Sequence, residues 1–264
     1  PPQGEAIAEL TAGELRLKGG IERYDWALTT ALAAPDAPAS QWQARGDGSA
    51  TELNIAEARI GVLDGQVLAS GRVAWREGVQ AELKLAGEAL NPAPLAPDWP
   101  GRLGLELNAT AEFGEHTRIA FELPKLAGTL REQPLNLATR GIWQDGTLEL
   151  PILTGRYGTA SLDGELRYGA EIAAKLNLAV PELAGLLPRA GGALTLNAEA
   201  NGKPEALDLR LDGQARKLSF EHHRISALNL AATLAGSKRL DLKLDAQDLK
   251  TGETKALKVI AACD

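Results

Sequence analysis

The stretch Leu207-Asp208-Leu209-Arg210-Leu211-Asp212 alternates leucine with a charged residue at every position. Successive side chains of a β-strand point to opposite faces, so this stretch predicts a strand with one apolar and one polar face. The same period of two recurs at residues 15–18, 103–108, 194–197 and 240–245. We therefore predict an all-β, mostly antiparallel protein whose strands each have one apolar and one polar face.

Glycine-containing pairs punctuate these runs at short intervals. They are Asp64-Gly65, Asp145-Gly146, Asp163-Gly164 and Asp212-Gly213. Asp-Gly between alternating runs is typical of a two-residue hairpin turn, so each pair is predicted to be one. The only helix that we expect is one or two turns within residues 181–188, which a proline opens and another ends.

Part of the sequence repeats with an offset of 93 residues. Residues 69–75 match residues 162–168, and each copy continues into a strand, a proline-rich bend and a further strand. We delimit the repeats at approximately 71–163 and 164–256, with a partial repeat over 1–70. Repetition of this kind indicates one elongated β-repeat segment over 1–264, without a linker or separate domains, whose units bury their faces against neighbours.

Composition excludes several classes of protein. The net charge is −7 and no long basic cluster occurs, which argues against binding to nucleic acid. The single cysteine, Cys263, permits no internal disulfide, and no stretch of about 20 apolar residues predicts a membrane span. The chain contains no methionine, and we interpret it as a fragment of a longer protein.

Reactive side chains are scarce and dispersed. His222 and His223 are adjacent, so a strand would point them to opposite faces, and His116 lies in a turn-like segment. No catalytic, metal-binding or phosphate-loop motif occurs, so we expect no enzyme activity, no cofactor and no metal site. A carbohydrate-active enzyme would need clustered carboxylates and aromatic platforms, whereas aromatic residues make up only 4% of the chain. The five tryptophans are expected to close the rims or ends of the sheet.

The apolar face itself is the remaining functional candidate. Aliphatic side chains along one face fit either a closed sandwich or an open trough that holds acyl chains. Repetition and the shortage of aromatic residues favour the trough. Its predicted lining is Leu83, Leu85, Leu103, Leu105, Leu107, Leu176, Leu178, Leu194, Leu196, Leu207, Leu209, Leu211, Leu228, Leu230, Leu240, Leu242 and Leu244.

One phrase resembles a known family. Residues 91–103, Asn-Pro-Ala-Pro-Leu-Ala-Pro-Asp-Trp-Pro-Gly-Arg-Leu, resemble a repeated phrase of the TamB family, within the AsmA-like superfamily of Gram-negative envelope proteins. Residues 126–135 are similar to the strands of that family, and residues 181–192 to its degenerate repeat.

The resemblance implies a fold and a function. Its members cross the periplasm as a long sheet curled into a U-shaped trough, a β-taco, from an anchor in the inner membrane. It thus implies a periplasmic conduit that carries phospholipid acyl chains between the inner and outer membranes, with the outer-membrane barrel TamA as a possible partner of the parent chain. The alternative is a structural scaffold that supports insertion of outer-membrane autotransporters through β-strand interactions.

Overall fold

The computed structural model describes residues 9–34, 37–76, 78–187, 189–221, 223–251 and 257–263. The chain divides into two compact units, Pro1–Pro134 and Leu135–Asp264, and each is described by itself. Within the described residues the regular structure is β-strand, apart from one turn of 3-10 helix, η1 (Leu183–Gly185). The all-β prediction is therefore confirmed, and the short helix is one turn that begins two residues after Pro181.

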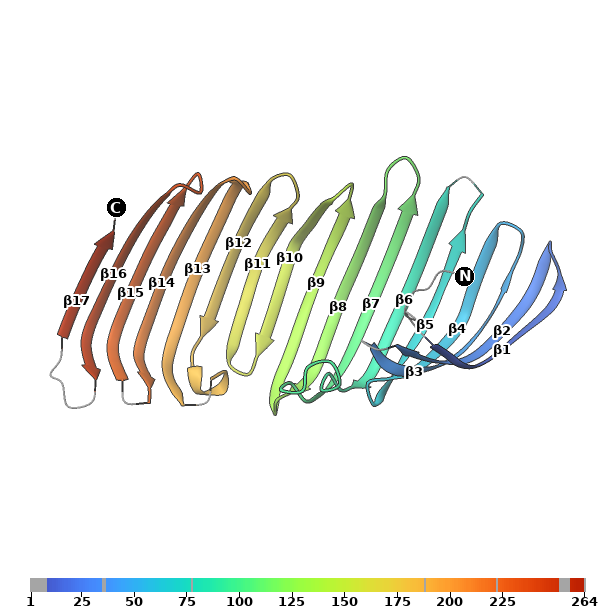
Figure 1. Cartoon of the computed structure of the whole chain (residues 1–264), viewed down its shortest axis with the longest axis horizontal. Helices are drawn as coiled ribbons and strands as arrows, with labels where there is room; N and C mark the ends of the chain where they lie inside the picture. The colour runs from blue at the N-terminus through green and yellow to red at the C-terminus, as the bar shows by residue number, and fades with distance from the viewer. Residues whose placement is uncertain are drawn as a thin grey trace. The chain divides into compact units, whose positions relative to one another are not determined.

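Unit 1 is an antiparallel meander in which each strand pairs with the next along the chain. Its strands within the described residues are β1 (Glu9–Gly20), β2 (Arg23–Ala34), β3 (Ala37–Gly48), β4 (Glu52–Val62), β5 (Gly65–Ala74), β6 (Val79–Leu90), β7 (Gly101–Phe113) and β8 (Arg118–Leu130) (Figure 1).

Unit 2 repeats this plan, again with each strand antiparallel to the next. Its strands within the described residues are β9 (Gln133–Gln144), β10 (Thr147–Tyr157), β11 (Ala160–Tyr168), β12 (Ile172–Val180), β13 (Ala190–Lys203), β14 (Ala206–Phe220), β15 (His223–Ala235), β16 (Arg239–Thr251) and β17 (Leu257–Cys263). The helical turn η1 lies in the loop between β12 and β13 (Figure 1).

Each unit is a single layer. Apart from isolated contacts, the described elements touch only the strand that precedes or follows them, and η1 touches β13. The chain exposes 17778 Å², whereas two compact globular domains of half its mass would together expose about 13,000 Å². A closed sandwich, the alternative left open above, is therefore not formed within either unit. Neither sheet closes or curls strongly, so the deep U-shaped curl stays a proposal.

Only some of the predicted turns form. Asp145 and Gly146 both have positive φ and connect β9 to β10, as predicted for a primed hairpin turn. Between β4 and β5 the turn residues are Leu63 and Asp64, both with positive φ, and Gly65 already belongs to β5. That turn is one residue earlier than predicted.

Two predicted turns are wrong, because Gly164 and Gly213 lie inside β11 and β14. A Cβ at Gly164 would come within 2.6 Å of Leu176 Cδ2, and one at Gly213 within 3.2 Å of Leu196 Cδ1. Neighbouring leucines thus occupy the space that a side chain would take, so these glycines serve packing across strands rather than chain reversal.

The two sequence copies have the same local register. Gly71 pairs with Leu83 between β5 and β6, and Gly164 pairs with Leu176 between β11 and β12. Both residues of the second pair lie 93 positions after their counterparts in the first pair. In both copies a loop then leads to the next strand, β7 or β13. The boundaries of the repeats remain a prediction.

The first of these loops, residues 91–100, is braced by one asparagine. Asn91 Oδ1 accepts hydrogen bonds from the backbone N–H of Ala93 (3.1 Å) and of Gly101 (3.3 Å), and its Nδ2 donates to Asp64 (2.9 Å). Arg131 lies over the Trp99 ring, 5.0 Å from its centroid. The loop is therefore held to the turns on both sides of it.

We expect Asn91→Ala to lower the free energy of unfolding by about 2 kcal/mol, because two backbone donors lose their acceptor. Urea denaturation of the purified chain measures this change. Asn201→Ala, at an exposed position of β13, is the matched control and should leave stability unchanged. Equal stability of the two variants would show that the loop does not depend on Asn91.

Candidate functional site

The strand register of unit 2 brings the predicted leucines onto one face. Paired residues of neighbouring strands share a face, and so do residues two apart on one strand. Leu178, Leu196, Gly213, Leu230 and Leu244 are successive partners across β12 to β16. The predicted residues of this unit that share their face are Leu176, Leu178, Leu194, Leu196, Leu207, Leu209, Leu211, Leu228, Leu230, Leu240, Leu242 and Leu244.

The predicted leucines of unit 1 are likewise brought together. Leu85 pairs with Leu107, and Leu105 and Leu103 pair with Gly87 and Leu90. Leu83 precedes Leu85 by two residues and so shares its face. We call the side of each sheet that carries these leucines the apolar face of that unit.

Side chains of the apolar faces are sheltered by their neighbours but not covered by a second layer. All the predicted lining residues are half-buried except Leu240, which is exposed. The fully buried apolar residues of the described chain also lie on these faces, and they are Ala58, Leu90, Ala160, Val180, Ala215 and Ala246. A contiguous apolar surface that no other layer covers is typical of a binding surface.

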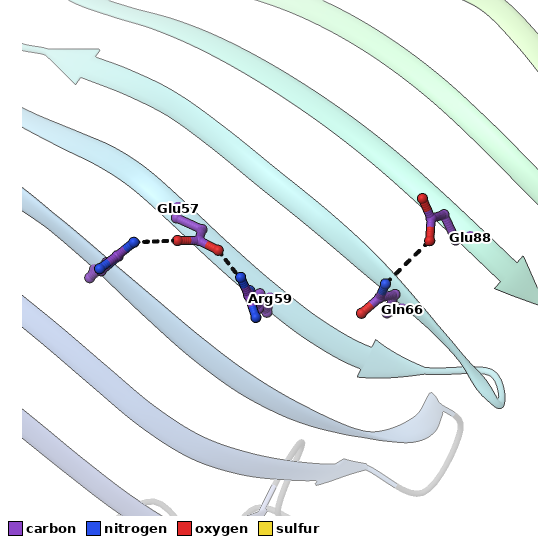
Figure 2. A network of polar contacts seen from close by, with 5 residues as sticks. Glu57, Arg59, Gln66 and Glu88 are labelled. Carbon is purple, nitrogen blue, oxygen red and sulfur yellow. Dashed lines mark hydrogen bonds and ion pairs between the residues drawn. The ribbon is translucent and has the colours of Figure 1, made fainter.

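The opposite face carries charged pairs. Glu57 accepts hydrogen bonds from Arg45 (2.6 Å) and Arg59 (2.7 Å). Gln66 donates to Glu88 across the next pair of strands, and Figure 2 shows this bond and the one between Arg59 and Glu57. Arg59 and then Arg45 lower the pKa of Glu57 below its ordinary value. Any stabilisation from this carboxylate is therefore present at neutral pH and is lost as the pH falls through its folded-state pKa.

The polar face of unit 2 has hollows between its charged side chains. One of 790 Å³ crosses β10 to β15, and Glu149, Glu165, Arg167 and Lys175 contribute to its lining. Glu149 pairs with Arg167 and Glu165 with Lys175 across neighbouring strands, the ordinary arrangement of a solvated sheet face. Leu209 borders this hollow, and Leu230 and Leu244 border a second of 690 Å³ whose other lining is mainly polar.

The residues considered for catalysis are not gathered into a site. His116 lies in the turn between β7 and β8 and is exposed, and His223 begins β15 and is exposed. His222 lies outside the described residues, and Cys263 ends β17 without a described side chain. In the part of the chain that the structure describes, no three metal-binding side chains cluster, and no helix has the length and hydropathy to cross a membrane.

Aromatic residues of the apolar face were missed by the sequence analysis. Trp75 and Trp143 do lie at strand ends, but Trp26 and Trp42 lie inside β2 and β3. Trp26 is the partner of Gly46, and its Nε1 donates to the carbonyl of Asn54 (3.2 Å). The sequence did contain a signal for Trp26: it alternates with Tyr24 and Leu28 at a period of two, which places all three side chains on the same face of a strand.

Comparison with known proteins identifies a family and distant relatives. Residues 1–260 match the family described as "TamB, N-terminal domain". The chain is 25% identical over 248 residues to the translocation and assembly module subunit TamB of Haemophilus influenzae. That match covers 90% of this chain and 19% of the relative, so the chain spans about a fifth of its length. No solved structure matches the chain.

Proposed function

Because the chain belongs to the TamB N-terminal domain family, we propose that it is a section of a translocation and assembly module subunit whose apolar faces carry phospholipid acyl chains. The observation that carries this proposal is the uncovered row of half-buried leucines on each unit. The protein would act without catalysis as part of a conduit through the Gram-negative envelope, anchored in the inner membrane through its parent chain and curled more strongly into a trough there.

Aliphatic side chains suit this cargo. Burial of each methylene from water contributes about 0.8 kcal/mol, so an acyl chain gains most when its whole length contacts leucine and alanine. The phosphate headgroup would remain in water, because an unpaired charge against an apolar surface is costly. Since the leucines form no directional contacts, they hold a chain without fixing its position, as sliding along the sheet requires. TamA is the partner proposed for the whole subunit.

Photo-crosslinking in cells tests this proposal residue by residue. With the probe placed in turn at positions 207 to 211 of β14, we expect phospholipid adducts at 207, 209 and 211 and none at 208 and 210. The reason is that Leu207, Leu209 and Leu211 share the apolar face, whereas Asp208 and Arg210 face the opposite side. Lipid adducts at all five positions, or at none, would contradict the proposal.

A scaffold for client strands is the second candidate function. Strand β1 pairs with β2 along one of its edges. Its residues Leu15 and Leu17 are 60% and 65% exposed, so they present apolar side chains at this end of the sheet of unit 1. A strand edge of this kind binds extended peptides by adding them to the sheet. Protein adducts at 15 and 17, in the absence of lipid adducts on β14, would favour this function over the conduit.

A further inference from the structure

Cations without carboxylate partners gather where β14 turns into β15. Arg216, Lys217 and Arg224 are exposed, and none of them forms an ion pair with another described residue. Glu221 is the carboxylate of this turn, and Arg189, at the end of the neighbouring loop, lies 3.4 Å from it. Three positive charges are therefore left over. We call residues 216–221 and 223–225, together with Arg189, the basic turn.

Two large apolar side chains are exposed beside these cations. Phe220, in the basic turn, is 53% exposed, and Leu187, in the loop that contains η1, is 56% exposed. Phe220 pairs with Ala190 of β13, and the N–H of Ala190 donates to the carbonyl of Leu187 (3.0 Å). The strand register thus places both side chains at the same end of unit 2. Exposed phenylalanine and leucine beside lysine and arginine are typical of segments that lie on a membrane surface.

The turn at the opposite end of β15 differs in its charge rather than in its apolar exposure. Leu240 is 52% exposed there, and Lys238 and Arg239 supply cations. Arg239, however, contacts Asp241 at 3.5 Å, and Asp208 accepts a hydrogen bond from the backbone N–H of Gly236 in the same turn. Carboxylates are therefore interleaved with the cations at that end, whereas the basic turn keeps an excess of positive charge.

The shape of this end favours a lipid surface over a protein partner. Unit 2 is a single layer, so the ends of the four strands β12 to β15 together cover about 20 Å by 10 Å. A stable protein interface buries about 800 Å² on each partner, several times this area. A bilayer surface needs no matching area, because its phosphate and glycerol groups surround individual side chains.

We propose that the basic turn docks unit 2 on the surface of an anionic bilayer. Arg216, Lys217 and Arg224 would contact lipid phosphates, while the side chains of Phe220 and Leu187 enter the region beneath the headgroups. A cation near an anionic bilayer strengthens binding about fivefold, the equivalent of about 1 kcal/mol. The proposal does not depend on the transport of acyl chains, because it concerns the end of the sheet rather than its apolar face.

The net charge of the chain, −7, does not prevent this contact. At physiological ionic strength, salt screens charges that lie more than about 8 Å from the bilayer surface. The acidic residues at the far ends of the strands lie beyond this distance, because β14 alone has 15 residues and is about 50 Å long. The charges near the basic turn therefore decide the attraction.

Flotation of the purified chain with lipid vesicles tests the proposal. We expect binding to vesicles of equal parts phosphatidylglycerol and phosphatidylcholine, and little binding to phosphatidylcholine alone. The triple variant Arg216→Gln, Lys217→Gln, Arg224→Gln should bind the anionic vesicles at least tenfold more weakly, because it loses three favourable charges. The double variant Leu187→Ser, Phe220→Ser should also bind several times more weakly, since its side chains no longer gain from entering the bilayer.

The opposite end of the strands supplies a matched control. Lys203→Gln, Lys238→Gln, Arg239→Gln removes the same three charges from the turns at residues 204–205 and 236–238. It should change vesicle binding by no more than about a factor of two, because these charges are screened from a bilayer at the basic turn. Leu196→Glu, on the apolar face, should bind vesicles like the unchanged protein, which keeps this proposal separable from the proposed function.

Three results would overturn the proposal. Absence of binding to anionic vesicles by the folded, unchanged chain would exclude it directly. Equal losses in the two triple variants would show that total charge, rather than the basic turn, governs binding. Binding of a soluble polyglutamate peptide, lost in the first triple variant and without any binding to vesicles, would indicate an acidic protein partner instead. Circular dichroism confirms that each variant is folded, and if Phe220→Ser does not fold, Leu187→Ser alone tests the apolar contribution.

Discussion

Replacing Leu196 with glutamate is expected to reduce the phospholipid that co-purifies with the chain by about tenfold or more, since a cost of only about 1.4 kcal/mol has that effect on binding. Leu196 lies in the middle of the apolar face, with Leu178 and Gly213 as its cross-strand partners. A carboxylate there would have to lose water when an acyl chain covers it. Mass spectrometry of lipid extracted from equal amounts of protein measures the effect.

The next residue along the strand supplies the control. Asn197→Glu adds the same charge to β13 but on the opposite, solvated face, where Asp212 is its partner. It should leave the bound phospholipid within about a factor of two, because an exposed surface change is worth about 0.5 kcal/mol or less. The same loss of lipid in both variants would show that charge, rather than the apolar face, governs binding. No loss in either would exclude this part of the sheet from the conduit.

A second large effect is expected on folding, from Gly46→Ala. A Cβ at position 46 would lie 1.8 Å from the carbonyl oxygen of Asn54 and 2.9 Å from Trp26 Nε1. Neither atom can move freely, because the indole donates its hydrogen bond to that same oxygen. We expect a loss of about 3 kcal/mol in the free energy of unfolding, as for an overpacked core position. Urea denaturation followed by far-UV circular dichroism measures it.

Gly61→Ala is the matched control for this substitution. It lies on β4, one of the strands beside Gly46, and its Cβ would meet only Gln41 Cβ at 3.9 Å, an ordinary contact. Its stability should change by no more than about 0.5 kcal/mol. Comparable losses of stability in Gly46→Ala and Gly61→Ala would mean that these strands do not tolerate an added methyl group at any glycine, whatever the space around it. A stable Gly46→Ala would mean that β3 and β4 do not approach as closely as described.

Strand positions were predictable from local pattern. The runs around Leu103, Leu194, Leu207 and Leu240 all lie in strands with the expected phase, because alternation of side chains is a property of the extended backbone itself. The pattern fails where a bulge shifts the phase. On β10 the register shifts between Leu150 and Leu153, so Ile152 is exposed although it is flanked by apolar residues.

Turns depended on neighbours that local pattern does not contain. Asp145-Gly146 forms a turn and Asp163-Gly164 does not, although the two pairs of residues are chemically identical. Arg131 and Glu132 adopt positive φ between β8 and β9 without glycine or asparagine. At Gly164 the neighbouring strand β12 leaves no room for a side chain, because Leu176 Cδ2 lies 2.6 Å from where a Cβ would be, whereas nothing lies within 4 Å of that place at Gly146.

The sequence by itself determined which side chains of this protein share a face, because a period of two leaves each strand only one way to separate leucine from charge. The tertiary structure alone decided that no second sheet covers that face within either unit. Coverage depends on contacts between segments distant in the sequence and on the loops that adjoin Leu90 and Val180. The alternation of residues predicts toward which face of the sheet a side chain points. It does not predict whether another part of the chain covers that face.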